Sequence, residues 1–517
     1  MKIDIESVFI RLRTWHVLIG VLLFFLILGT FKIIPLRPQS IHQWAQCDRA
    51  SVAWNYYTTD TDFFHPRVNN TDNGSGITGM EFPIVQYVVS LLYRLFGFHE
   101  WLYRLTTLII FTIGAFSVYR IARYFIQDKM YALLIMGWYF CSPLLAFYST
   151  SFLPDIYSLS FAMISWAALL KLKDRYTGIT MMGWLVPLLL SCLIKPNSLI
   201  HLPVMLFFLY REGVWSKKTR IQLSGCFLIV VAATFSWYYY ASWLSKSVQS
   251  EVFLLHVRPP NSWQEVKDVW ERVRLDWLER IYHPWILILI LVSGLILLVV
   301  ERPFRNKLAT YTLIMLFSCS AFLYVMFLQL SYHDYYFITM FPSLVFLLIF
   351  IFSSINARVN TRGKYVFAII VLGLLAVQFY FAKSHVRYAH KKGSWMYGSM
   401  HNDLYFDSDY FLTSAGIAPD DQVICIFDHS PNISLYLMGR RGVTIPCRVV
   451  PETLLGYLNS GRFKYVVYNQ FSGIEGVSFK PDDFPLEPVL EKNGIQVFKL
   501  SSSFHPSGVQ VPLSPWN

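Results

Sequence analysis

The sequence predicts a polytopic α-helical membrane protein with about eleven transmembrane helices and a small C-terminal extracytoplasmic α/β domain. Its 517 residues are 55% hydrophobic and 17% aromatic, which is typical of membrane proteins. Apolar runs near the ~20 residues needed to cross hydrocarbon recur along the chain. These runs are apolar on every side, whereas a spanning β-strand would alternate, so we expect helices.

Eleven segments are expected to be the spanning helices. They are residues 15–36, 102–122, 130–147, 153–170, 178–194, 198–210, 221–243, 284–300, 308–328, 335–355 and 365–382. The first segment follows a basic flank and is too long for the apolar core of a signal peptide. It also lacks a clear small-residue cleavage site, so we expect an uncleaved anchor.

The positive charge of the chain is distributed as a topology signal. The formal net charge is +12, which by itself would also suit a nucleic-acid-binding protein. On one side of the expected spans the connections contain 19 Lys and Arg against six Asp and Glu, whereas connections 142–152 and 329–334 contain no Lys or Arg. Basic connections stay in the cytoplasm. We therefore expect a cytoplasmic N-terminus and no nucleic-acid partner.

The first long loop, Arg37–Glu100, is expected outside the cytoplasm and carries two candidate functional residues. Most of its six acidic residues are expected to be ordinary solvated loop charges. Asp48 and Glu81 differ, because apolar or aromatic residues surround them in the sequence. Glu81 opens an apolar run that ends at Gly97. This run is expected to be a helix lying on the membrane surface.

Two further candidates lie at expected outer helix ends. Asp155 follows Pro154 in the first turn of the fourth span, where an acid either caps the helix or has a functional role. Lys195 precedes Pro196 between the fifth and sixth spans, where a lysine either reaches lipid headgroups or neutralises a lipid phosphate. The residues alone leave both questions open.

The second long outer loop and the last outer junction supply the remaining candidates. The loop, residues 245–283, contains His256 and Arg258, followed by tryptophans at helical spacing that predict a helix on the membrane interface. The junction before the tenth span contains Tyr335 and Tyr336. Tyrosines are also common there as simple interface residues.

The composition becomes polar from about residue 385. We expect residues 1–384 to form the transmembrane domain that carries the candidate residues, and residues 385–517 to form the α/β domain. Strands are expected at Gln422–Phe427, Tyr465–Tyr468 and Ile495–Leu500, and short helices at Asn432–Met438 and Glu452–Leu458. No glycine-rich phosphate loop or nucleophile motif occurs in this region.

The candidate residues map to one outer surface and suit group transfer from a phosphate-bearing lipid. A carboxylate such as Asp48 can deprotonate an acceptor hydroxyl or amine. Glu81 and His256 are residue types that bind Zn²⁺ or Mn²⁺. Lys195 and Arg258 can compensate the charge of a phosphate leaving group. Spacing alone does not select this chemistry.

Over roughly residues 10–385 the order of these motifs resembles that of the integral-membrane GT-C glycosyltransferases. The resemblance is to the branch that contains protein O-mannosyltransferases, which use dolichyl-phosphate mannose, and the lipid A aminoarabinose transferase. Its ordered features are Asp48 after the first span, the helix from Glu81 that ends Tyr-Arg-Leu-Phe-Gly97, Pro154-Asp155, Lys195-Pro196, His256 with Arg258, and His333-Asp-Tyr-Tyr followed by Pro342.

The resemblance implies inverting transfer of a hexosyl or pentosyl group from a polyprenyl- or dolichyl-phosphate donor to an extracytoplasmic glycan, lipid or protein. The implied roles are Asp48 as general base, Asp155 as a supporting acid, Glu81 and His256 as ligands of a divalent metal ion (Zn, Mn or Mg), and Lys195, Arg258, Tyr335 and Tyr336 around the lipid phosphate. One position departs from the pattern. Mannosyltransferases of this group commonly have Asp-Glu where this chain has Asp48-Arg49, which puts mannose transfer to protein in doubt.

Three other classes of protein are alternatives to a transferase. A polyprenyl-lipid flippase or transporter predicts ionisable residues in mid-span and internal repeats, whereas the candidates lie at helix ends and in loops. A lipid-linked oligosaccharide ligase or polymerase would share the lipid-phosphate site. A structural scaffold would not gather polar residues on one outer surface. We expect a transferase in a bacterial inner membrane, with the C-terminal domain in the periplasm.

Overall fold

The computed structural model describes residues 14–212, 216–250, 252–253, 257–302, 305–397, 402–428, 430–446, 451–471 and 479–504. The chain packs as two compact units. The first comprises Met1–Pro35, Arg104–Tyr238 and Leu255–Tyr388, and the second comprises Leu36–Tyr103, Tyr239–Leu254 and Ala389–Asn517. The predicted boundary at residues 384/385 falls within a helix of the structure, Thr361–Ala389, and this division into domains stays a prediction.

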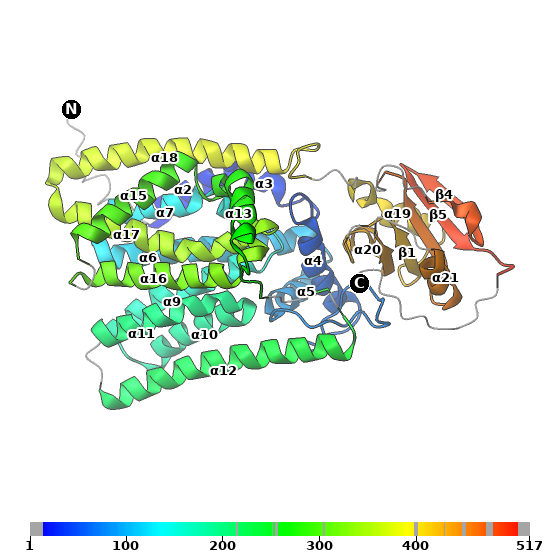
Figure 1. The fold of residues 1–517 in the computed structure, drawn as a ribbon, viewed down its shortest axis with the longest axis horizontal. Coiled ribbons are helices and arrows are strands. Elements are labelled where there is room, and N and C mark those ends of the chain that lie inside the picture. The colour runs from blue at the N-terminus through cyan, green and yellow to red at the C-terminus, as the bar shows by residue number, and fades with distance from the viewer. Residues whose placement is uncertain are drawn as a thin grey trace. The chain divides into compact units, whose positions relative to one another are not determined.

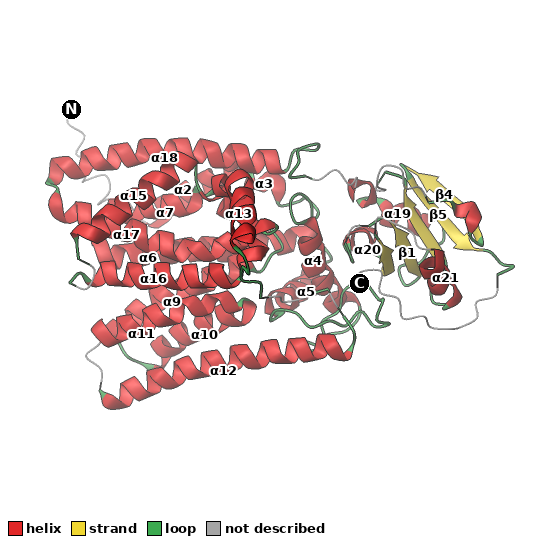
Figure 2. Cartoon of the chain, viewed as in Figure 1, coloured by secondary structure: helices red, strands yellow, loops and turns green. Residues whose placement is uncertain are grey.

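The first unit is built from helices (Figures 1 and 2). The elements that lie wholly or mainly in it are α2 (Thr14–Leu28), α3 (Thr30–Ile33), α6 (Glu100–Ile126), α7 (Lys129–Phe140), α8 (Pro143–Tyr148), α9 (Asp155–Asp174), α10 (Gly178–Ile194), η1 (Pro196–Ile200), α11 (His201–Glu212), α12 (Lys217–Ser247), α13 (Trp263–Arg272), η2 (Val273–Trp277), α14 (Leu278–Ile281), α15 (Pro284–Val300), α16 (Lys307–Val325), η3 (Phe327–Ser331), η4 (Asp334–Met340), α17 (Phe341–Arg358) and α18 (Thr361–Ala389). Helix α9 packs against α10, and α17 packs against α7, α15 and α16.

Each of the eleven segments predicted to span contains a helix, but the count of about eleven spans is not confirmed. Six helices of the described residues are long and apolar enough to cross a membrane: Glu100–Ile126, Asp155–Asp174, Lys217–Ser247, Lys307–Val325, Asp334–Arg358 and Thr361–Ala389. A seventh span results if the bent pair Trp263–Ile281 and Pro284–Val300 crosses as one. The described helices α7, α10 and α11 have 12, 17 and 12 residues, fewer than the ~20 expected of a full span. These findings support an integral membrane protein.

The sequence determines where the short helix α10 begins and where it ends, at the turn before α11. Thr177 and Thr180 form a reciprocal capping box at the start of α10. At the other end Lys195 is extended, with φ −145° and ψ 122°, as expected for a residue that precedes proline. Pro196 then opens η1. Lys195 therefore lies at a break between helices rather than within one.

The second unit combines helices of the first long loop with a five-stranded sheet. Its elements are α4 (Gln43–Thr58), α5 (Ile84–Phe96), η5 (Asn402–Tyr405), α19 (Ser408–Ser414), β1 (Gln422–Ile426), α20 (Ile433–Met438), β2 (Arg441–Ile445), α21 (Pro451–Asn459), β3 (Tyr465–Asn469), η6 (Pro481–Asp483), β4 (Leu486–Lys492) and β5 (Ile495–Leu500). The strand order is β2-β1-β3-β5-β4. Strands β2, β1 and β3 are parallel, and β5 runs antiparallel to both β3 and β4.

A segment of the first long loop extends this sheet at its β2 edge. Asn70 forms a parallel β-bridge with Gly442. The Gly442 N–H donates to the carbonyl of Asn69 at 3.1 Å, and the Thr71 N–H donates to the carbonyl of Gly442 at 2.7 Å. The side-chain amide of Asn69 also donates to the carbonyl of Arg440 at 2.9 Å. The loop and the sheet are thus joined by backbone pairing.

Gly442 is the position where this pairing has no room for a side chain. A Cβ atom there would lie 1.8 Å from the carbonyl oxygen of Val423, on the neighbouring strand. We predict that Gly442→Ala destabilises the second unit by about 1–3 kcal/mol, because the strands must separate to admit the methyl group. Thermal unfolding of the purified protein would measure this. Gly373→Ala in α18, where nothing lies within 4 Å of the added Cβ, should not destabilise the protein, and equal effects of the two substitutions would contradict the prediction.

Candidate functional site

The candidate base, Asp48, lies on the buried helix α4 of the second unit. Its side chain is fully buried, and neither carboxylate oxygen forms a hydrogen bond of full geometry with any residue that the structure describes. The N-terminus of α4 is held by Gln46, whose amide donates to the carbonyls of Gln39 and Ile41 at 3.0 and 3.2 Å. A rigid helix therefore carries a carboxylate whose own hydrogen-bonding capacity is not used up.

Burial is the main cause that sets the pKa of Asp48. It raises the pKa to about 7, because a desolvated carboxylate loses the water that stabilises its charge. The guanidinium of Arg49 lowers the pKa, the carboxylates of Glu81 and Asp428 raise it, and the amide of Asn432 lowers it. A carboxyl group with this pKa is partly ionised at neutral pH and accepts a proton readily, as a general base must.

The Glu81 carboxylate forms an ion pair with Arg49, which lies on α4 next to Asp48. The Nε of Arg49 lies 2.8 Å from Glu81 Oε1, and its Nη2 donates to Oε2 at 3.4 Å. Both side chains are buried, and the Arg49 guanidinium also lies 4.8 Å from the centroid of the Phe253 ring. This paired arrangement is the form in which a buried carboxylate and guanidinium stabilise one another.

The predicted metal site does not assemble from the described residues alone. Its second predicted ligand, His256, lies outside the described residues. Within the described residues no group of three or more His, Cys, Asp or Glu side chains could hold a metal ion, and the Glu81 carboxylate already faces Arg49. The described residues therefore do not form a metal site by themselves, and the metal stays a prediction.

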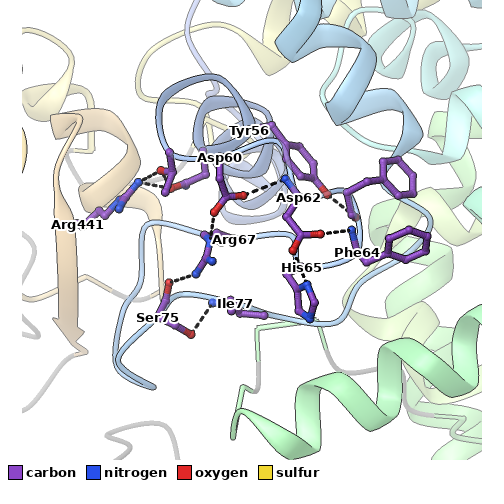
Figure 3. A network of polar contacts seen from close by, with 12 residues as sticks. Tyr56, Asp60, Asp62, Phe64, His65, Arg67, Ser75, Ile77 and Arg441 are labelled. Atoms are coloured by element: carbon purple, nitrogen blue, oxygen red, sulfur yellow. Dashed lines mark hydrogen bonds and ion pairs between the residues drawn. The ribbon is translucent and has the colours of Figure 1, made fainter.

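Two other acids of the first long loop have structural partners (Figure 3). Asp60 accepts from the Nε of Arg67 at 3.0 Å. Asp62 lies 2.7 Å from Nδ1 of His65 and accepts from the Phe64 N–H at 3.1 Å. Burial raises the pKa of Asp62, but the hydrogen bonds from His65 and Phe64 together outweigh this effect, so the pKa lies below its usual value. These acids shape the loop.

The first unit brings four predicted residues together in a second cluster. Lys195 Nζ lies 3.5 Å from Oδ1 of Asp155. It also lies 5.5 Å from the ring centroid of Tyr335 and 5.9 Å from that of Tyr336, and the two rings stack at 5.1 Å. The His333 ring stacks on Tyr335 at 5.2 Å. The Lys195 ammonium is therefore held by a carboxylate and by two aromatic faces.

The last predicted phosphate residue, Arg258, also belongs to the first unit. Its carbonyl accepts from the N–H of Leu328 in η3 at 3.0 Å, and its side chain is exposed. The backbone bond fixes the loop beside η3, six residues before η4. The long, exposed guanidinium is available to an anionic partner.

A buried ion pair that the sequence reasoning missed supports the Tyr335 segment. Arg280 and Asp334 form an ion pair and are almost wholly buried. The other oxygen of Asp334 accepts from the Tyr148 hydroxyl at 2.6 Å, and the Arg280 guanidinium lies 5.7 Å from the ring of Phe147. This pair ties α14 and α8 to the first residue of η4, directly before Tyr335. Asp334 itself was visible in the His-Asp-Tyr-Tyr motif, but its cationic partner was not.

Breaking this pair on one side should destabilise the protein strongly. We predict that Asp334→Asn costs about 3–5 kcal/mol, because it leaves the Arg280 charge buried without compensation. Chemical unfolding in detergent, followed by tryptophan fluorescence, would measure the loss. Arg272→Gln is the matched control, since it breaks the exposed pair of Arg272 with Asp276, and such pairs contribute little. Similar losses for the two variants would argue against this role of the pair.

The comparisons with known proteins give a family over part of the chain and a fold over nearly all of it. The model of a family described as dolichyl-phosphate-mannose-protein mannosyltransferase matches residues 81–239, a range that includes Glu81, Asp155 and Lys195. No curated protein matches the chain.

Solved structures match at low sequence identity. The structure of ArnT from Cupriavidus metallidurans in the apo state matches with a TM-score of 0.62 and 13% identity, and the match covers 94% of this chain and 98% of that one. The structure of the same protein bound to undecaprenyl phosphate gives a TM-score of 0.58 and 12% identity over 94% and 98% of the two chains. The arabinofuranosyltransferase AftD from Mycobacteria gives 0.57 and 12% identity, over 96% of this chain and 40% of that one.

At such identities the structures establish the shared fold, and the family model adds the glycosyltransferase match. The resemblance predicted from the order of the sequence motifs is confirmed at the level of the superfamily. The family match over residues 81–239 and the fold shared with these structures support a membrane glycosyltransferase of the GT-C superfamily.

Proposed function

We propose that the protein transfers a sugar from a polyprenyl- or dolichyl-phosphate donor to an acceptor outside the cytoplasm, with inversion at the anomeric carbon. The observation that carries the proposal is the state of Asp48. Its carboxylate is fully buried, and its pKa is raised to about 7. Neither carboxylate oxygen forms a hydrogen bond of full geometry with a described residue. This is how a general base is kept ready for a proton.

In the proposed reaction Asp48 takes the proton of an acceptor hydroxyl or amine. The acceptor atom forms a bond to the anomeric carbon of the sugar while the bond from that carbon to the phosphate oxygen breaks. The electron pair of the broken bond stays on the phosphate, so negative charge grows there as the lipid phosphate leaves. The proton remains on Asp48 until it is released to solvent.

The Lys195 cluster is proposed to hold the lipid phosphate. The ammonium of Lys195 would compensate the growing negative charge, the exposed guanidinium of Arg258 would add a second cation, and the hydroxyl of Tyr335 or Tyr336 would donate a hydrogen bond. Asp155, 3.5 Å from Lys195, would orient the ammonium. The complex of ArnT with undecaprenyl phosphate supports a lipid phosphate as the ligand of this fold.

The acceptor and the cellular setting are also part of the proposal. An extracytoplasmic glycan, lipid or protein would fit, and Arg49 in place of a second acid favours a glycan or lipid over a protein. We place the protein in a bacterial inner membrane with its N-terminus in the cytoplasm and the sheet of the second unit on the periplasmic side. If Glu81 and His256 bind a metal ion, that ion would supply Lewis-acid chemistry.

Removing the base should stop transfer without preventing donor binding. We predict that Asp48→Asn lowers the turnover rate by at least ~10²-fold, because an amide cannot accept the proton. The measurement uses radiolabelled polyprenyl-phosphate sugars, an envelope extract as acceptor and equal amounts of the two proteins, with donor binding assayed separately. Undiminished transfer by Asp48→Asn would move the base to Asp155 or Glu81. Movement of the lipid across the bilayer without sugar transfer would favour a flippase.

Removing the cation proposed to bind the phosphate should weaken binding of the lipid-phosphate sugar. We predict that Lys195→Ala raises the KM for the lipid-phosphate sugar by roughly tenfold or more, because a charged hydrogen-bond donor is lost. Lys173 is a close structural match near the other end of α9, where its Nζ lies 3.3 Å from Glu212 and 5.2 Å from the Tyr124 ring centroid. Lys173→Ala should therefore leave the donor KM unchanged. An equal rise of KM in both variants would refute the assignment of Lys195.

A further inference from the structure

The strand order of the sheet points to one end of β1 as a contact site. Strand β1 lies between β2 and β3, so the order of the parallel strands reverses beside it. In open α/β sheets the carboxyl ends of the strands at such a reversal form the usual ligand crevice. In this chain the connection that leaves this end of β1 meets the helix of the candidate base instead. Helix α20 packs on α4.

The connection between β1 and α20 is internally fixed. The described residues of this β1–α20 connection are Phe427, Asp428, Ser430, Pro431 and Asn432. The carboxylate of Asp428 accepts from the N–H of Ser430 at 2.9 Å and from that of Ser434 at 2.6 Å. The hydroxyl oxygen of Ser430 accepts from the N–H of Asn432 at 3.2 Å. Asp428, Ser430, Asn432 and Ser434 are all buried, so these hydrogen bonds hold the described residues of the connection to one another.

Asn432 turns the donor end of its amide toward α4. Its Oδ1 accepts from the backbone N–H of Asn70 at 3.2 Å, and its Nδ2 donates to the carbonyl of Cys47 at 3.4 Å. Because the oxygen is engaged on the Asn70 side, the N–H groups face the helix turn that carries Asp48. The side chain of Asn432 is fully buried, so no water competes for these bonds.

The same amide lies close enough to Asp48 to lower the pKa of its carboxyl group, although neither carboxylate oxygen forms a hydrogen bond of full geometry with a described residue. Of the groups that face Asp48, Asn432 and Arg49 favour its ionised form, whereas Glu81 and Asp428 oppose it. Arg49 is ion-paired with Glu81, and Asp428 caps its own turn. Asn432 is thus an uncharged hydrogen-bond donor that can stabilise the ionised Asp48 carboxylate without adding a charge to the site.

We infer that the β1–α20 connection is a positioning element of the transfer reaction, and that Asn432 orients the Asp48 carboxylate. When the carboxylate ionises, an N–H of this amide would donate to one of its oxygens and leave the other to take the acceptor proton. This inference rests on the proposed function, because Asn432 acts only through Asp48. Under this inference, a residue of the C-terminal part of the chain positions the catalytic base.

The test compares pH–rate profiles of the full-length protein and its Asn432→Ala variant. The rate of the wild-type protein should rise with pH through about 7, because Asp48 must lose its proton to act as base. Loss of the donor makes the carboxylate harder to ionise, so the acid limb of the variant should move to higher pH by about one unit. Below the limb the variant should be roughly tenfold slower, and above it the rate should recover, with the donor KM unchanged.

The matched control is Asn70→Ala, which removes a bond to the same turn without freeing the Asn432 amide. Its side chain donates to the carbonyl of Pro431 at 2.9 Å, whereas Asn432 accepts from its backbone N–H. The acid limb of Asn70→Ala should therefore stay in place. If Asn432→Ala is too unstable to assay, Asn432→Ser keeps a donor and should give a smaller shift in the same direction.

Two outcomes overturn the inference. One is an Asn432→Ala enzyme whose rate falls equally at every pH, which would indicate a purely structural role. The other is an equal shift of the acid limb in Asn432→Ala and Asn70→Ala. The Asp48→Asn variant separates this failure from failure of the proposed function. If Asp48→Asn is inactive while Asn432→Ala leaves the limb unchanged, Asp48 remains the base and only the role of Asn432 is lost.

Discussion

The cost of burying charge governs the polar architecture of both units. A buried ion costs several kcal/mol unless an opposite charge or hydrogen bonds compensate it. Three buried or largely buried acids meet this requirement with a cation: Glu81 with Arg49, Asp155 with Lys195, and Asp334 with Arg280. Asp48 forms no such ion pair within the described residues, and its burial without one raises its pKa to about 7. Perturbed groups of this kind gather at functional sites, which is why Asp48 carries the functional argument.

The sequence predicted the helices well because their signal is local. A long apolar run needs no distant partner to be recognised. The number of spans is not confirmed, because it depends on where a helix breaks and how it tilts, as at Pro196. Among the strands, β1, β3 and β5 coincide with predicted runs, but β2 and β4 were missed. Strand β4 is largely exposed and contains Pro488 and charged residues, so only its pairing with β5 makes it a strand.

The residues of the candidate site also differ in whether the sequence could predict them. Asp155, Lys195 and the two tyrosines were predictable as one cluster, because each stands at a helix end on the same expected side of the membrane. Arg280 was not, because in sequence it is one of several charges in an amphipathic stretch. Asn432 was not either, because an uncharged residue gives no signal, and its contact with α4 joins positions 385 apart in the chain. Contacts at that separation follow from tertiary packing rather than from local pattern.

The Asp48-Arg49 pair gives a physical reason for the departure from the Asp-Glu pattern. Asp48 already faces two carboxylates, Glu81 and Asp428, that raise its pKa. A third acid at position 49 would add to this repulsion and keep the base protonated at neutral pH, unless a metal ion compensated the charge. Arg49 instead supplies a fixed cation that pairs with Glu81 and lowers the pKa of Asp48. Arg49 therefore changes how the negative charge around the proposed base is balanced, while the carboxylate of Asp48 remains at the position before it.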